Sequence, residues 1–169
     1  MGLRILVAED EAITLKHLTY ALGAEGREAG GDGNGIAAVG RTEQAPFDLL
    51  IADIKMPGMD GLALLAEVRA RHPETAVIIV TGFGSVESAV DAMRRGALDY
   101  VTMPFNLDEL LLKVRRVAEK KRLEHDNEAL KLALGGSHPF VGRSPAFRKI
   151  AEAVESIRES DCTVLLTGE

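Results

Sequence analysis

The stretch FDLLIADIKMPGMDG, residues 47–61, places an unbroken apolar run directly before an aspartate, Asp53, and a segment rich in proline and glycine. Apolar runs of this length between turn residues are typical of strands that are buried on both faces of a sheet. Similar runs rich in valine, isoleucine and leucine occur at residues 3–8, 76–81 and 98–102. The pattern therefore predicts buried strands at all of these places.

Between the apolar runs, hydrophobic residues recur at helical spacing. They are Ile13, Leu15, Leu18 and Leu22, then Leu62, Leu65 and Val68, then Val86, Ala89, Val90 and Met93. Strands that alternate with helices predict βαβ units and a parallel sheet. A further short edge strand is expected near residues 27–29, followed by a mobile loop at GGDGNG, residues 30–35. This loop is not a dinucleotide fingerprint, because Ile36 stands where the third glycine is needed.

The composition excludes several classes of protein. The chain has 169 residues and a formal net charge of −6 with its acidic residues spread along its length, so we do not expect it to bind nucleic acid itself. A single cysteine, Cys162, excludes an internal disulfide. No apolar run approaches the roughly 18 residues of a membrane helix, and the N-terminus reaches acidic residues too early for a signal peptide. We expect a cytoplasmic protein that has no membrane partner.

A long helix is predicted after Pro104. Asn106 is a suitable cap, and no glycine or proline follows until Gly135, so the helix is expected to run for nearly 30 residues, roughly 40 Å. Its first apolar stripe is suited to packing on the sheet and consists of Leu107, Leu110, Val114 and Val117. Its second stripe has the spacing of a two-stranded coiled coil with one polar position, and consists of Leu123, Asn127, Leu130 and Leu134. The alternative is a solvated connector helix.

Residues 140–169 indicate the start of a new structural segment. Ser144 and Pro145 are suited to begin a helix, and a strand is expected at TVLLT, residues 163–167. Because about thirty residues cannot bury a core of their own, this tail is interpreted as a fragment of a second domain. We predict three parts: a domain over residues 1–120, a helical linker over 121–139 and the fragment over 140–169.

Carboxylates follow the predicted strands. In an open parallel sheet, ligands bind at the carboxyl ends of the strands, and with strand order 2-1-3-4-5 the strands that end near Glu9, Asp10 and Asp53 are neighbours. We therefore expect these three carboxylates to converge, with Thr81 at the end of the next strand. Clustered carboxylates repel unless a cation is present, and hard oxygen ligands suit Mg²⁺.

This set of residues indicates phosphoryl transfer. Mg²⁺ neutralises an incoming phosphoryl group, a carboxylate beside it can act as a nucleophile, and the Thr81 hydroxyl can donate to a phosphoryl oxygen. The simpler interpretation is that the acids only cap strand ends and helices. A phosphatase of the haloacid dehalogenase type would need D-x-D after the first strand, where this chain has EDE, residues 9–11.

Four segments are similar to the signature segments of bacterial response-regulator receiver domains. They are ILVAEDE (5–11), DLLIADIKMPGMDGLALL (48–65), VIIVTGFGS (77–85) and DYVTMPF (99–105). The resemblance implies an α/β fold, flavodoxin-like or CheY-like, with a doubly wound five-stranded parallel sheet of order 2-1-3-4-5. It also implies two partners, a second copy of the chain in a homodimer and a sensor histidine kinase. Receivers accept a phosphoryl group from the phosphohistidine of such a kinase.

The resemblance assigns roles to single residues. Asp53 would be the phosphoacceptor, and Mg²⁺ would be held by Asp10, Asp53, the Lys55 backbone carbonyl and, through water, Glu9. Thr81 and Tyr100 would form the switch pair that reads the phosphoryl group.

The tail, residues 140–169, resembles the opening of the AAA+ ATPase domain in NtrC-type activators of sigma-54 RNA polymerase. The sequence ends at Gly168 and Glu169, which match the first two residues of the Walker A loop, so we do not expect this chain to be an enzyme that hydrolyses ATP. Contacts with sigma-54 RNA polymerase and DNA would come only through domains that are absent from this sequence.

One position departs from the receiver pattern. Receivers carry a lysine directly before the proline of the last segment, and this chain carries Met103. Two interpretations follow. Either the protein is a phosphorylation-controlled receiver that regulates dimerisation and an attached sigma-54-activating ATPase, or it is a phosphorylation-insensitive pseudo-receiver that acts as a dimerisation module.

Overall fold

The computed structural model describes residues 2–82, 85–104, 106–133 and 150. The chain divides after Glu124 into two units, Met1–Glu124 and His125–Glu169. The first unit contains the whole sheet. Among the described helices, none is long and apolar enough to cross a membrane.

Five parallel strands form one sheet in the order β2-β1-β3-β4-β5. The strands are β1 Arg4–Ala8, β2 Glu28–Asp32, β3 Leu49–Asp53, β4 Ala76–Thr81 and β5 Asp99–Thr102. The helices are α1 Ala12–Ala24, α2 Gly35–Gln44, α3 Gly61–Arg71, α4 Val86–Arg94 and α5 Leu107–Ala133. The predicted doubly wound α/β fold, its strand order and its long C-terminal helix are confirmed.

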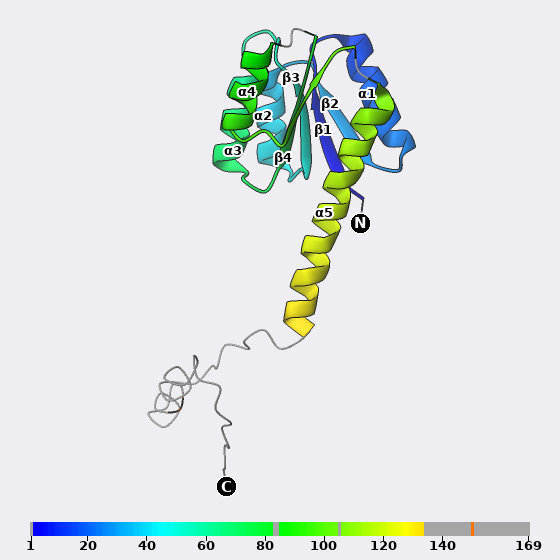
Figure 1. Ribbon diagram of the computed structural model, residues 1–169, viewed down its shortest axis with the longest axis vertical. Coiled ribbons are helices and arrows are strands. Elements are labelled where there is room, and N and C mark those ends of the chain that lie inside the picture. The colour runs from blue at the N-terminus through cyan, green and yellow to red at the C-terminus, as the bar shows by residue number, and fades with distance from the viewer. Residues whose placement is uncertain (1, 83–84, 105, 134–149, 151–169) are drawn as a thin grey trace. The chain divides into compact units, whose positions relative to one another are not determined.

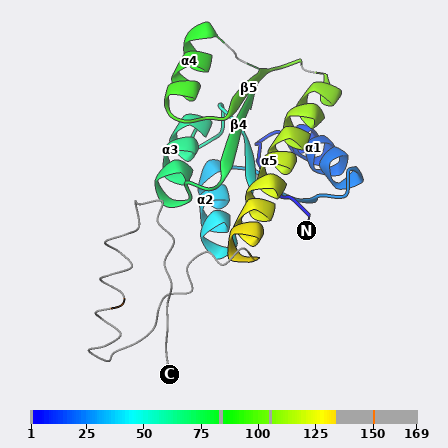
Figure 2. The same cartoon turned by 60° about the horizontal axis from the view of Figure 1, so that its bottom comes forward.

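Two apolar layers cover the faces of the sheet. Helices α1 and α5 lie on one face and α2, α3 and α4 on the other (Figures 1 and 2). Successive residues of a strand point to opposite faces, so Ile5 and Val7 of β1 pack toward α1 and α5, whereas Leu6 and Ala8 pack toward α2 and α3. Burial on both faces explains why the central strands read as unbroken apolar runs.

The edge strand β2 corrects one prediction. The expected mobile loop over residues 30–35 is wrong in its first half, because Gly30 and Gly31 belong to β2. A Cβ added to Gly31 would lie 2.7 Å from Leu15 Cδ1, so a larger residue at this position would require the Leu15 side chain of α1 to move. Gly31 thus serves close packing of a helix on a strand.

Side-chain caps begin several helices. Asn34 accepts a hydrogen bond from the Ala37 N–H at the start of α2, and Asp60 accepts one from the Ala63 N–H at the start of α3. The predicted cap Asn106 accepts one from the Asp108 N–H before α5. These caps fix where each helix begins relative to the strand before it.

Helix α4 and the second half of α5 expose apolar residues. In α4, Val86, Val90 and Met93 are exposed although their spacing is helical. In α5, Leu110, Val114 and Val117 are buried as the stripe predicts, but Leu107 is exposed. Leu123 and Leu130 of the second stripe are also exposed, whereas Leu134 lies outside the described residues. The predicted elements after residue 140, except for Ile150, lie outside them too.

Candidate functional site

The three predicted carboxylates meet at the carboxyl end of the sheet. Asp53 is the last residue of β3, and Glu9 and Asp10 directly follow β1, its neighbour in the sheet. One carboxylate oxygen from each of them lies within 4.8 Å of the other two. Glu9 and Asp53 are buried, and Asp10 is exposed. The parallel sheet therefore brings together acids that are more than forty positions apart in the chain.

The β3–α3 connection holds Asp53 in place. Its Oδ2 accepts a hydrogen bond of 3.1 Å from the Lys55 N–H, and the Gly61 N–H donates to the Ile54 carbonyl at 2.9 Å. A Cβ at Gly61 would lie 2.2 Å from the Asp53 carbonyl oxygen. Only glycine allows the start of α3 to approach the end of β3 so closely, and this explains the glycine that ends the segment over residues 47–61.

Burial of like charges shifts the acidity of the cluster. The pKa of Glu9 is raised from 4.5 to about 7, mainly by burial and also by the carboxylates of Asp53 and Asp10, while a hydrogen bond from the Glu11 N–H opposes the shift. Burial also raises the pKa of Asp53, and hydrogen bonds from the Thr81 hydroxyl and from backbone N–H groups oppose this.

The cluster fits a hard divalent cation. Asp53 is 8% exposed, yet its Oδ1 atom has no hydrogen-bond partner among the described residues. A buried carboxylate oxygen without a partner is costly unless a cation or another ligand satisfies it. Oxygen donors from Glu9, Asp10 and Asp53 match the preference of Mg²⁺.

Thr81 and Tyr100 lie at different levels of the β4–β5 pair. Thr81 ends β4, is fully buried and is paired in register with Thr102, whereas Tyr100 is paired with Ile79. The Tyr100 ring packs on the apolar layer beneath α3 and α4, and its hydroxyl lies 2.8 Å from Ser88 Oγ. Thr81 thus contacts Asp53, and Tyr100 contacts α4 through Ser88.

Met103 lies directly after β5. Its N–H donates to the Thr81 carbonyl at 2.7 Å, and its side chain packs against the apolar layer beneath α1 and α5. The backbone of Met103 is therefore hydrogen-bonded to the backbone of Thr81. The thioether adds to the apolar layer and brings no charge.

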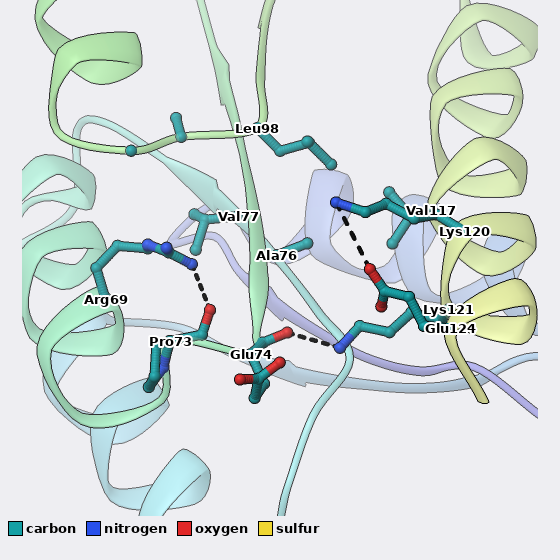
Figure 3. A pocket seen from close by; sticks show the side chains of 12 residues that line it. Arg69, Pro73, Glu74, Ala76, Val77, Leu98, Val117, Lys120, Lys121 and Glu124 are labelled. Carbon is teal, nitrogen blue, oxygen red and sulfur yellow. Dashed lines mark hydrogen bonds and ion pairs between the residues drawn. The ribbon is translucent and has the colours of Figure 1, made fainter. Parts of the chain in front are cut away.

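A pocket of about 290 Å³ lies at the opposite end of the sheet, beside the start of β4. Ala76, Val77 and Val117 line it, and its charged rim groups are engaged with neighbours (Figure 3). The pairs are Arg69 with the Pro73 carbonyl, Lys121 with the Glu74 carbonyl, and Lys120 with Glu124. The contact of Lys121 ties α5 to the α3–β4 loop, and all three contacts lie at the end of the sheet opposite to the carboxylates.

The sequence prediction missed Ser85 and Ser88. Ser85 caps α4, and the two serines form a reciprocal capping box. A serine followed three residues later by a second hydrogen-bonding side chain is a known start signal for a helix, so this box could have been found. The contact between Ser88 and Tyr100 is tertiary, and no local pattern announces it.

Comparison with known proteins identifies the family. A model described as the response regulator receiver domain matches residues 5–115, which is more than half of the chain. The chain belongs to the response regulator receiver domain family. Its match includes the acid cluster, Thr81 and Tyr100, and stops within α5.

Relatives of this receiver are regulators of the NtrC family, as predicted. The chain is 37% identical to "Regulatory protein AtoC" of Escherichia coli K12 over 98% of its own length, and 32% identical to "DNA-binding transcriptional regulator NtrC" of the same organism over 98%. It spans 37% and 35% of the lengths of these two relatives. The receiver domain of NtrX from Brucella abortus superposes with a TM-score of 0.65 at 37% identity, covering 68% of this chain and 98% of that one.

Proposed function

We propose that Asp53 accepts a phosphoryl group from the phosphohistidine of a sensor histidine kinase. The observation that carries this proposal is the buried, unpartnered Oδ1 of Asp53 within a cluster of carboxylates. In the reaction, Oδ1 would attack the phosphorus, the phosphorus–nitrogen bond of the phosphohistidine would break, and an acyl phosphate would form on Asp53. The imidazole would leave with the electron pair of that bond.

The residues around Asp53 support this step. Glu9, Asp10, Asp53 and the Lys55 backbone carbonyl would hold Mg²⁺, which when bound supplies positive charge for the phosphoryl oxygens. The Lys55 N–H keeps the other oxygen of Asp53 fixed, so that Oδ1 is the atom left to react. The Thr81 hydroxyl, now directed to Asp53, would turn to a phosphoryl oxygen after transfer.

The output would reach helix α4 and then a dimer. Val86, Val90 and Met93 form an exposed apolar stripe on α4, which is suited to contact with another protein surface. Leu123 and Leu130 are exposed on α5 and suited, with Asn127 and Leu134, to a two-stranded coiled coil between two copies. Phosphorylation would change these contacts and so the activity of an attached ATPase.

The activities of the longer relatives remain proposals for this chain. We propose a parent protein of three parts, with the receiver over residues 1–120, a linker over 121–139 and the beginning of an ATPase domain over 140–169. Hydrolysis of ATP and contacts with sigma-54 RNA polymerase and DNA would then belong to segments that this sequence does not contain.

Met103 favours a second candidate function, a pseudo-receiver that dimerises without sensing phosphate. Its thioether packs in the apolar layer, and no ammonium stands at this position to meet phosphoryl oxygens. A charge-assisted hydrogen bond of that kind is worth roughly 1.5 to 3 kcal/mol. Of the two candidates we favour phosphoryl control, because Glu9, Asp10, Asp53 and Thr81 are all present.

Phosphorylation with acetyl phosphate and Mg²⁺ tests the proposal. We expect wild type to become labelled, and Met103→Lys to be labelled about tenfold faster or to hold its label longer, with a matching change in oligomeric state by light scattering. Met103→Leu is the uncharged control and should behave as wild type. Equal labelling and equal oligomeric state for wild type and Met103→Lys would rule out an effect of this position, and no labelling of either would favour the pseudo-receiver.

A further inference from the structure

A hydrogen bond joins the first turn of α4 to β5. Ser88 Oγ and the Tyr100 hydroxyl lie 2.8 Å apart. Ser88 Oγ also donates to the Ser85 carbonyl at 2.9 Å, and this uses its only proton. In this arrangement the Tyr100 hydroxyl is the donor to Ser88 Oγ; the geometry of the contact itself allows either oxygen to donate.

Little else holds α4 to the molecule. In α3, Gly61, Leu64, Leu65 and Val68 are buried, whereas Ala92 is the only buried residue of α4. Apolar burial is the main force that attaches a helix to a sheet, and α4 contributes a single small side chain to it. One hydrogen bond is therefore a large share of the free energy that positions α4.

Tyr100 depends on the same contact. Its ring is half-buried against the apolar layer beneath α3 and α4, and among the described residues its hydroxyl has Ser88 as its hydrogen-bond partner. The Tyr100 ring and helix α4 are thus linked by this hydrogen bond. A displacement of Tyr100 must break the bond or carry the first turn of α4 with it.

We propose that Ser88 is a positioning residue that holds Tyr100 against α4 in the unphosphorylated receiver and sets how readily the switch leaves this state. This inference rests on the proposed phosphoryl-controlled function. The bond stabilises the arrangement seen here relative to any arrangement in which the Tyr100 ring has moved away from α4. Its loss should shift the equilibrium toward the other arrangement.

The expected shift is modest and measurable. Removal of one hydrogen bond should change the equilibrium about fivefold, which corresponds to about 1 kcal/mol because RT is about 0.6 kcal/mol. A phosphoryl analogue that selects the other arrangement should then bind to the Ser88→Ala variant about fivefold more tightly than to wild type. Beryllium trifluoride with Mg²⁺ is the probe, because it mimics a phosphoryl group on a carboxylate.

The composition of the chain offers a direct optical signal. It contains no tryptophan and two tyrosines, and Tyr20 is 80% exposed on α1. In a Tyr20→Phe background, Tyr100 is therefore the only tyrosine, and its fluorescence reports its own hydrogen bond and surroundings. Titration with beryllium trifluoride and Mg²⁺ gives the binding curve, and the signal before titration gives the starting population.

Three variants in this background separate positioning from helix capping. Ser88→Ala should shift the starting signal toward that of the saturated protein and lower the half-saturating concentration about fivefold. Ser88→Thr keeps a hydroxyl and should restore wild-type behaviour. Ser85→Ala removes the cap but leaves the Ser88 hydroxyl, so it should lower helix stability without changing the Tyr100 signal as Ser88→Ala does.

The outcomes distinguish this inference from the proposed function. An unchanged or higher half-saturating concentration in Ser88→Ala would overturn the positioning role, even if wild type responds to the probe. Equal effects of Ser85→Ala and Ser88→Ala would also overturn it, because capping alone would then explain both. If no variant responds to beryllium trifluoride at all, the proposed function itself fails.

Discussion

Charged side chains are arranged differently at the two ends of the sheet. At the carboxyl end, Glu9 and Asp53 are buried beside Asp10, and Asp53 Oδ1 has no hydrogen-bond partner in the described part of the chain. At the amino end, the pocket beside β4 is lined by both basic and acidic side chains. There Lys121 donates to a carbonyl and Lys120 is paired with Glu124.

The comparison distinguishes charges that stabilise the fold from charges that form a functional site. The charged groups at the amino end have partners and cost little, and Lys121 fastens α5 to the α3–β4 loop, so they need no ligand to explain them. Buried like charges at the carboxyl end raise the free energy of the folded state, and natural proteins retain such arrangements mainly at functional sites. The acid cluster is therefore the region where substitutions should have unusual effects.

The largest expected effect is that of Gly61→Ala at the carboxyl end. Its Cβ would meet the Asp53 carbonyl oxygen at 2.2 Å, so either β3 or the start of α3 must move. We expect a loss of about 3 kcal/mol or more in the free energy of unfolding, measured by urea denaturation, because a backbone clash in a packed site cannot relax cheaply.

Gly40→Ala is the matched control, because a Cβ at Gly40 in α2 meets nothing within 4 Å. It should leave stability unchanged or raise it by up to about 1 kcal/mol. Equal stability of the two variants would contradict the close approach of α3 to Asp53.

The next effect is an inverted pH dependence of stability without metal. Glu9 has a folded-state pKa of about 7 against 4.5 for an ordinary glutamate, so the folded protein holds a proton that the unfolded chain releases between these values. Stability in EDTA should therefore fall as the pH rises from about 4.5 to 7, by about 2 to 3 kcal/mol from this group.

Glu9→Gln removes this titration and should flatten the pH profile in that range. The variant should also be more stable than wild type at pH 8 in EDTA, because a neutral amide replaces a buried charge. Excess Mg²⁺ should reduce the difference by stabilising wild type. A wild-type stability that rises with pH between 4.5 and 7 in EDTA would contradict the raised pKa of the buried Glu9.

The smallest effect is expected at the amino end. Lys121→Met removes the hydrogen bond of 2.7 Å to the Glu74 carbonyl but keeps the length of the side chain. The loss should be below about 1 kcal/mol and insensitive to Mg²⁺. The exposed Arg122→Met is its control and should have no effect; a loss as large as that of Gly61→Ala would erase the contrast between the ends.

Much of this contrast could be predicted from the sequence. Unbroken apolar runs fix buried parallel strands, and a parallel sheet brings the residues that follow its strands to one edge, so Glu9, Asp10 and Asp53 were expected to converge. Their convergence follows from the order of the parallel strands. The capped start of α5 at Asn106 followed from local chemistry in the same way.

Features that depend on distances between elements could not be predicted. The glycines at 30 and 31 resemble a loop by composition, yet they pair in register with Leu6 and Val7 of β1, and Gly31 lies close to Leu15 of α1. The spacing of Val86, Val90 and Met93 is that of a buried face, yet α4 leaves these residues exposed. Spacing shows that side chains share a face of a helix, and does not show what covers that face.

Intact-protein mass spectrometry after treatment with acetyl phosphate and Mg²⁺ tests the central claim, that the unpartnered Asp53 oxygen is a phosphoryl acceptor, most directly. We predict that wild type gains one phosphoryl group, that EDTA prevents the gain, and that peptide mapping after borohydride reduction places it on Asp53. Asp53→Asn, which keeps the shape of the side chain, should gain none. Equal modification of wild type and Asp53→Asn, or none of either, would contradict the account.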